Sequence, residues 1–89
     1  MPVRSSVRFT DAYIKSLKPT ASRYELYDAN LAGFGIRVSP SGAKSWMAFS
    51  RNMERKTRVT LGRYPQMPLG QARQRAMNTL MEMADGEFQ

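Results

Sequence analysis

The sequence predicts an α+β domain: a three- to four-stranded antiparallel sheet, packed on one face by a C-terminal helix, with a short N-terminal helix. Three observations lead to this class. Apolar and polar residues alternate along residues 34–38, as in a strand with one buried face. A turn signal at residues 39–42 (Ser-Pro-Ser-Gly) separates them from a second apolar segment. From Leu69 to Met83, apolar residues recur every three or four positions, as in an amphipathic helix.

The first element is a short helix that begins near Thr10, whose hydroxyl can cap free backbone N–H groups. Asp11 follows at the positive end of the helix dipole, and Pro19 ends the helix. Tyr13, Ile14 and Leu17 form its apolar edge. Residues 1–9, before the helix, are polar and basic, and we expect them to be a flexible N-terminal segment.

The strands follow at residues 23–28, 34–38, 44–51 and 55–61, and residues 62–65 end the sheet. The middle strand can lie in two registers. Burying Trp46 under the helix turns Met47, Phe49 and Arg51 outward, whereas the opposite register buries Met47 and Phe49. We favour a buried Trp46, because this single tryptophan is the largest core side chain in a small protein.

The last helix is expected over residues 68–85, with Pro68 in its first turn and Gly86 just past its end. Its apolar stripe consists of Leu69, Ala72, Ala76, Leu80 and Met83. Arg73 borders this stripe, so we expect a structural role for it, with Asp28 or loop carbonyls as its partner.

Positive charge is concentrated in the middle of the chain. The 89 residues carry 14 Lys and Arg against 7 Asp and Glu, a net charge of +7, and residues 37–63 hold seven of the basic residues and one acid. Such a segment attracts polyanions, of which nucleic acid is the commonest in a cell. An acidic membrane surface or an acidic protein partner is the alternative.

Composition excludes several classes of function. The chain has no cysteine and no histidine, which excludes disulfide scaffolds, Cys/His zinc sites and thiol or Ser-His nucleophiles. We therefore expect no cofactor, no metal site and no enzyme activity of this chain by itself. The longest unbroken apolar stretch is Trp46-Met47-Ala48-Phe49, too short for a membrane span, and the absence of cysteine fits the cytoplasm.

Seven blocks of residues occur together in a characteristic order. They are Thr10-Asp11, residues 14–19 (IKSLKP), 24–28 (YELYD), 33–38 (GFGIRV), 40–46 (PSGAKSW), 60–65 (TLGRYP) and 69–73 (LGQAR). With this pattern the sequence resembles the N-terminal DNA-binding domain of phage-type integrases, the tyrosine recombinases of prophages and genomic islands. The blocks cover nearly all of residues 9–86. The family usually has an acid and a proline after the final glycine, whereas Gly86 is followed by Glu87-Phe88-Gln89.

The resemblance implies a single domain over residues 10–86 and the start of a linker at 87–89, leading to absent core-binding and catalytic domains. It also implies sequence-specific binding of arm-type or accessory double-stranded DNA, with the sheet in the major groove, in the bacterial cytoplasm at the nucleoid. In this family a catalytic tyrosine belongs to the separate C-terminal domain. We assign no catalytic role to the four tyrosines of this chain.

The candidate DNA-contacting residues are the side chains that strand alternation or turn position leaves outside the core. Arg37 and Arg58 are candidates for base edges, because an arginine fork matches guanine. Near strand ends and turns, Lys44, Arg55, Lys56 and Arg63 are candidates for phosphates. The remaining candidates are Phe49, Arg51 and Thr60.

Two alternatives remain open at this level: a small basic RNA-binding protein, and a protein-interaction module whose charge is incidental. The first favours exposed aromatic residues on the sheet, for which Phe49 is the candidate. For the second, Met77, Met81 and Phe88 form an apolar strip beside the helix stripe, either as a wider core or as a surface for self-association or for a neighbouring domain.

Overall fold

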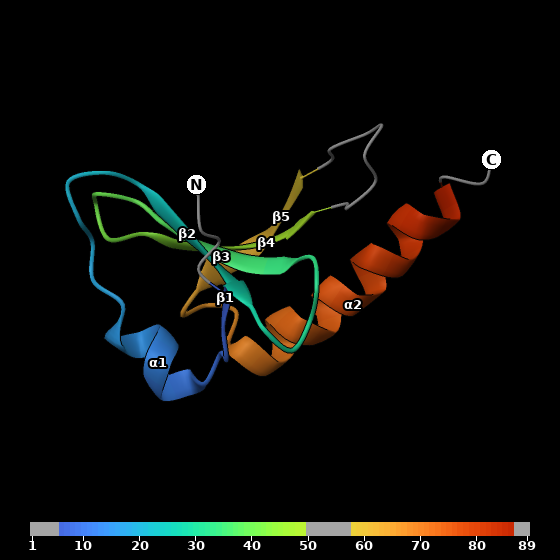
Figure 1. Cartoon of the computed structure of the whole chain (residues 1–89), viewed down its shortest axis with the longest axis horizontal. Coiled ribbons are helices and arrows are strands. Elements are labelled where there is room, and N and C mark those ends of the chain that lie inside the picture. Colours follow the sequence, from blue (N-terminus) through green and yellow to red (C-terminus); the bar gives the residue numbers. More distant parts are fainter. Residues whose placement is uncertain (1–5, 50–57, 87–89) are drawn as a thin grey trace.

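The computed structural model describes residues 6–49 and 58–86, which form a five-stranded sheet and two helices (Figure 1). In chain order the elements are β1 (Ser6–Val7), α1 (Asp11–Ser16), β2 (Tyr24–Asp28), β3 (Phe34–Val38), β4 (Lys44–Phe49), β5 (Arg58–Tyr64) and α2 (Leu69–Gly86). The strands lie in sequence order, with β2 to β5 antiparallel and β1 parallel to β2. The predicted α+β class is confirmed, with one strand more than expected.

The additional strand is β1, which changes our expectation for the N-terminus. Ser6 and Val7 pair with β2, and the carbonyl of Val7 accepts a hydrogen bond from the backbone N–H of Ala29 (2.8 Å). Phe9 is buried, with its ring 5.6 Å from that of Phe34 in an edge-to-face arrangement. Residues 6–9 are therefore ordered rather than flexible, because Phe9 anchors them in the core. Residues 1–5 lie outside the described part of the chain.

Helix α1 begins where its capping signal predicts and ends at Ser16, so Leu17, which we expected within the helix, is its C-cap. The side chain of Thr10 accepts a hydrogen bond from the backbone N–H of Tyr13 (3.1 Å), and Ile14 is completely buried. Ile14 belongs to the same core cluster as Ala72 and Ala76 of α2. Both helices therefore pack on the same face of the sheet, as Figure 1 also shows.

The core lies between that face and α2, and Trp46 is at its centre. Its ring stacks on Phe34 with centroids 5.4 Å apart, and its Nε1–H donates to the carbonyl of Met67 (2.7 Å). The predicted register of β4 is confirmed, because Trp46 and Ala48 are core residues. On α2 the expected stripe is also confirmed: Leu69, Ala72 and Ala76 are buried, and Leu80 and Met83 pack against them.

Strand β5 continues further than the sequence predicts. We expected this strand to end at Leu61 and residues 62–65 to end the sheet, but β5 runs to Tyr64 through an irregularity opposite Trp46 and Met47. Met47 pairs with Thr60 and Trp46 with Gly62, so Leu61 is the extra residue of a β-bulge. A Cβ at position 62 would lie 2.7 Å from Cε of Met67, so the missing side chain makes room for this methionine.

Candidate nucleic-acid interface

The face of the sheet opposite the two helices is called the outer face here. Residues directly opposite each other on neighbouring strands share a face, so the pairing defines its members. One row across the sheet is Glu25, Arg37, Ser45 and Arg63, the next is Tyr27, Gly35, Met47 and Thr60, and the last is Phe49 and Arg58.

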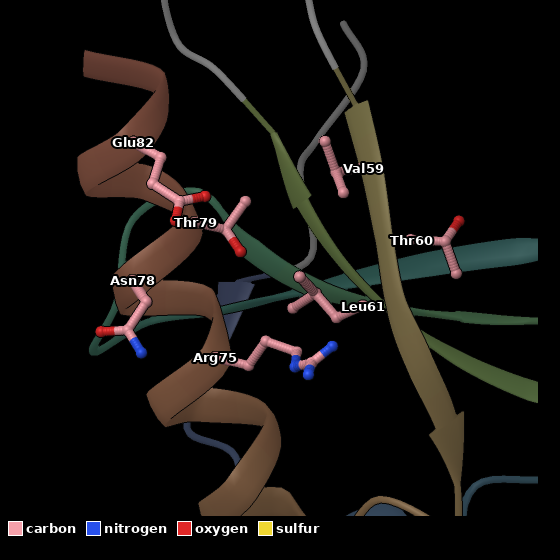
Figure 2. A pocket seen from close by; sticks show the side chains of 7 residues that line it. All are labelled: Val59, Thr60, Leu61, Arg75, Asn78, Thr79 and Glu82. Atoms are coloured by element: carbon pink, nitrogen blue, oxygen red, sulfur yellow. The ribbon is translucent and has the colours of Figure 1, made fainter. Parts of the chain in front are cut away.

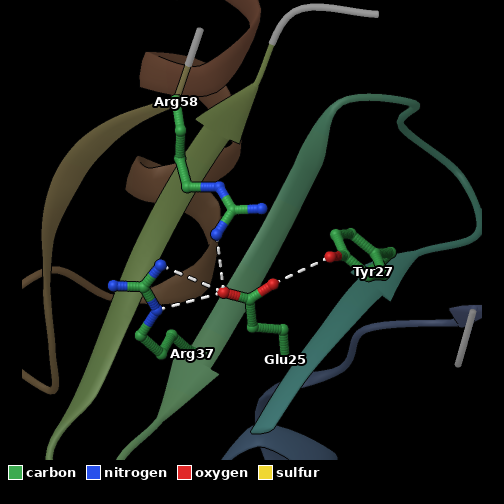
Figure 3. Close-up of polar contacts among 4 residues, drawn as sticks. All are labelled: Glu25, Tyr27, Arg37 and Arg58. Carbon is green, nitrogen blue, oxygen red and sulfur yellow. Dashed lines mark hydrogen bonds and ion pairs between the residues drawn. The ribbon is translucent and has the colours of Figure 1, made fainter. Parts of the chain in front are cut away.

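Two arginines converge on one carboxylate of this face (Figure 3). Arg37 donates through Nε (3.1 Å) and Nη2 (3.0 Å) to Oε2 of Glu25, and Arg58 donates through Nη1 to the same oxygen (2.8 Å). The hydroxyl of Tyr27 donates to the other oxygen, Oε1 (2.9 Å). The side chain of Arg58 is 47% exposed and that of Arg37 28%, so both guanidinium groups still face solvent.

The cluster keeps Glu25 ionised. Burial raises the pKa of its carboxyl, but hydrogen bonds from Tyr27 and Arg37, together with the charges of Arg58 and Arg37, outweigh this effect. The pKa of Glu25 therefore lies below its ordinary value. At neutral pH the three charged side chains carry a net charge of +1.

The strand alternation also places other predicted residues on the outer face. Thr60 and Arg63 are exposed there. Without the bulge at Leu61, Arg63 would have the same orientation as this core leucine; the bulge turns it outward. Phe49 is half-buried, with its ring 5.1 Å from that of Tyr27 in an edge-to-face arrangement. Met47, which we expected to be accessible on this face, is 1% exposed and offers no surface to a ligand.

Lys44, a predicted phosphate contact, does not lie on the outer face with Arg37, Arg58 and Arg63. It pairs with Tyr64 and lies on the helix side of the sheet, where its Nζ donates to the carbonyl of Ile14 (2.9 Å) and is 5.3 Å from the centre of the Tyr64 ring. Its ammonium group thus caps the last turn of α1. Three further candidates, Arg51, Arg55 and Lys56, lie outside the described residues.

Sequence reasoning missed Glu25 as a member of the site. It was treated as part of a loosely alternating strand, and no signal within that strand links it to an arginine. The signal was the hairpin between β2 and β3: turn residues at Asn30 and Gly33 bring position 25 opposite position 37 once the register is counted from the turn.

A shallow pocket of about 310 Å³ lies at the edge of β5 against α2 (Figure 2). Its lining comprises Val59, Thr60, Leu61, Arg75, Asn78, Thr79 and Glu82. None of the arginines of the outer face lines it, and the pocket adjoins that face through Thr60. Within residues 6–49 and 58–86 no group of acidic side chains lies close enough together to hold a metal ion. No helix in this part of the chain combines the length and the hydropathy needed to cross a membrane.

Comparison with known proteins supports DNA binding by this domain. The model of the Arm DNA-binding domain family matches residues 9–87. Prophage integrase IntA of Escherichia coli (strain K12) is 33% identical over 72 residues, which cover 79% of this chain and 17% of that integrase. The chain thus spans less than a fifth of the length of this relative. An arm DNA-binding domain is non-catalytic. The chain belongs to the arm DNA-binding domain family, a DNA-binding module of the integrase type.

Proposed function

We propose that this domain binds double-stranded DNA in a sequence-specific manner by laying its outer face in the major groove. The observation that carries the proposal is the position of Arg37, Arg58 and Arg63, all on the one face that neither helix covers. A major groove about 12 Å wide admits a layer of strands. In that position, side chains on alternate residues point at the base edges.

The contacts divide by position on the face. Arg37 and Arg58, whose guanidinium groups meet at Glu25, are proposed to contact base edges, with Thr60 and Phe49 beside them. Arg63 lies towards the end of β5 and is proposed to contact a phosphate, which gives affinity without sequence choice. The same role is proposed for Arg51, Arg55 and Lys56.

The parent protein is proposed to be a tyrosine recombinase of a prophage or genomic island. The similarity to a prophage integrase supports this class. The domain would then bind arm-type or accessory sequences of an attachment site in the bacterial cytoplasm, at the nucleoid. It would serve DNA integration and recombination, while other domains of the same integrase cut and join the strands.

Binding-site selection from random duplexes, followed by fluorescence anisotropy, tests the proposal. Contacts to about six phosphates predict a loss of affinity of about a thousandfold between 50 and 200 mM salt. Arg37→Ala or Arg58→Ala should narrow the ratio between the affinities for selected and scrambled duplexes, whereas Lys56→Ala should weaken both equally. Arg75→Ala is the matched control, because Arg75 is an exposed arginine on α2.

Three results would contradict the proposal. If Arg37→Ala, Arg58→Ala and Lys56→Ala each lost the same affinity for the selected and the scrambled duplex, Arg37 and Arg58 would not contact base edges. A preference for single-stranded RNA over duplex DNA in competition would favour an RNA-binding protein instead. No binding to any nucleic acid at about 50 mM salt, where electrostatic attraction is strong, would favour a protein-interaction module.

A second surface on α2 is proposed as a contact for the rest of the integrase or for a second copy. Met77 is 39% and Met81 66% exposed, and both are large apolar side chains. Phe88, which we expected to extend this strip, lies outside the described residues. Sedimentation of the chain at high concentration tests self-association. If the chain remains a monomer, the other domains of the integrase are the proposed partner of this surface.

A further inference from the structure

The outer face contains a carboxylate, although a surface that meets phosphates is expected to be positive throughout. Among the described acids, Asp11 is on α1, Asp28 is buried, and Glu82 and Asp85 are on α2, so only Glu25 lies on the outer face. An isolated acid here would repel DNA. Its contacts give it a different role.

Glu25 accepts hydrogen bonds from one side of each guanidinium group and leaves the N–H groups on another side without a partner among the described residues. Arg37 uses Nε and Nη2, so the pair formed by Nη1 and the second N–H of Nη2 has no partner among the described residues. Arg58 uses Nη1, so its Nε and Nη2 likewise have no partner within the described part of the chain. Each guanidinium therefore retains a fork of two donors, the geometry that binds O6 and N7 of guanine.

Glu25 is itself fixed in place. Tyr27 donates to Oε1 while both arginines donate to Oε2, so neither carboxylate oxygen lacks a donor. The side chain of Glu25 is 20% exposed, and Arg37 lies directly opposite it on β3. A free arginine side chain loses considerable rotamer entropy when it binds, and ordering it beforehand reduces that loss.

We propose that Glu25 is a positioning residue of the DNA-binding face: it orders the guanidinium groups of Arg37 and Arg58 for contact with bases, and its charge weakens binding to unselected DNA. This inference rests on the proposed function. Removal of Glu25 should release both arginines to contact phosphates of any sequence. Sequence choice should fall, while affinity for random DNA should rise.

The experiment uses the 89-residue chain, a duplex selected from a random pool by the wild-type protein, and a scrambled duplex of equal composition. Affinities for both are measured for wild type, Glu25→Gln, Glu25→Asp and Glu82→Gln. Glu25→Gln removes the charge and keeps the shape. Glu25→Asp keeps the charge but shortens the side chain by one methylene, and Glu82→Gln removes an exposed charge from α2.

We expect Glu25→Gln to lower the ratio of the two affinities about tenfold, the size of one good base contact, with tighter binding of the scrambled duplex. Glu25→Asp should lower the ratio as well, without that tightening, because only the geometry has changed. Glu82→Gln should keep the wild-type ratio. In NMR spectra the Nε–H proton of Arg37 should exchange faster with water in both Glu25 variants.

The positioning role would be overturned if either Glu25 variant kept the wild-type ratio of affinities for the selected and the scrambled duplex. It would also be overturned if Glu82→Gln lowered this ratio as much as the Glu25 variants do. Equal tightening of both duplexes by Glu25→Gln would also overturn it, since that is the effect of charge alone. Failure of the proposed function is a different result, in which the wild-type chain itself binds neither duplex. Thermal unfolding of each variant shows that the compared proteins are folded.

Discussion

Nη2 of Arg73 on α2 lies 3.1 Å from Oδ2 of Asp28 on β2, and the side chain of Asp28 is completely buried. The other oxygen of Asp28 accepts the backbone N–H of Asn30 (3.1 Å), and Arg73 also donates to the carbonyl of Phe9 (3.5 Å). The ion pair thus joins α2, the sheet and the N-terminal segment. It confirms the partner expected for Arg73 from its place beside the apolar stripe.

Arg73→Met should therefore destabilise the domain substantially. The change leaves a buried carboxylate without its counter-charge, and breaking a buried pair in this way costs about 3–5 kcal/mol. We expect the lower end, because the side chain of Arg73 is 35% exposed. Urea unfolding followed by Trp46 fluorescence measures the free energy of unfolding.

Two further variants serve as controls for this pair. Asp28→Asn should cost less, since its amide oxygen can still accept the N–H of Asn30. Arg75→Met should have almost no effect, because Arg75 is exposed on the same helix. Equal losses for Arg73→Met and Arg75→Met would show that the ion pair does not stabilise the fold.

Two glycines should respond to alanine with opposite signs. Gly33 has φ +90°, and a Cβ there would lie 2.9 Å from Cδ2 of Leu80 and 3.0 Å from the carbonyl of Phe49. Gly33→Ala should cost at least about 1–2 kcal/mol from the backbone conformation alone. Gly70, in the first turn of α2, has no neighbour within 4 Å of such a Cβ, so Gly70→Ala should stabilise by up to about 1 kcal/mol. The midpoints of urea unfolding distinguish them, and a stabilising Gly33→Ala would contradict the packing described.

The ion-pair cluster at Glu25 predicts how stability depends on pH. Because the pKa of Glu25 is lowered in the folded protein, its contribution is complete above the pKa of the unfolded chain, about 4.3. The contribution is then lost as the pH falls through the lower pKa of the folded state. Between pH 6 and about pH 3, the wild type should lose more unfolding free energy than Glu25→Gln. Parallel curves for the two proteins would mean that the cluster does not lower this pKa.

Lys44 and Arg63 should separate stability from DNA binding. Lys44→Gln removes the hydrogen bond from Nζ to the carbonyl of Ile14, so its thermal midpoint should fall while the salt dependence of DNA binding stays that of wild type. Arg63→Gln should leave the midpoint unchanged and reduce the slope of log K against log salt by about 0.9, the value for one phosphate. A reduced slope for Lys44→Gln would instead support the phosphate contact that its position in the sequence suggested.

Much of the fold was predictable because its signals are local. The alternation of residues 34–38, the capping of α1 by Thr10 and the apolar stripe of α2 each depend on a few neighbouring residues. The volume of a single tryptophan was enough to choose the register of β4, and Trp46 is indeed central to the core. The order of seven sequence blocks pointed to the family that the comparisons show.

The arrangement of the candidate site was less predictable, because it depends on pairing between distant strands. Arg37 and Arg58 were expected on one face, but their shared contact with Glu25 requires the register of the four strands from β2 to β5. The outward direction of Arg63 depends on a bulge at Leu61, for which strict alternation gives no sign. Lys44 is near a turn in the sequence, yet the helix that it caps is 30 residues away along the chain.

The amino-acid sequence alone therefore determined the α+β class, the main elements, the side of the sheet that α2 covers and the family. These follow from polarity repeated at a helical or strand period, which any short segment carries within itself. Only the tertiary structure decided that Phe9 orders the N-terminal segment, that Lys44 turns toward α1, and that the carboxylate of Glu25 lies between Arg37 and Arg58. Each of these results from contacts between residues far apart in the chain, whose partners are defined only once the strands are paired.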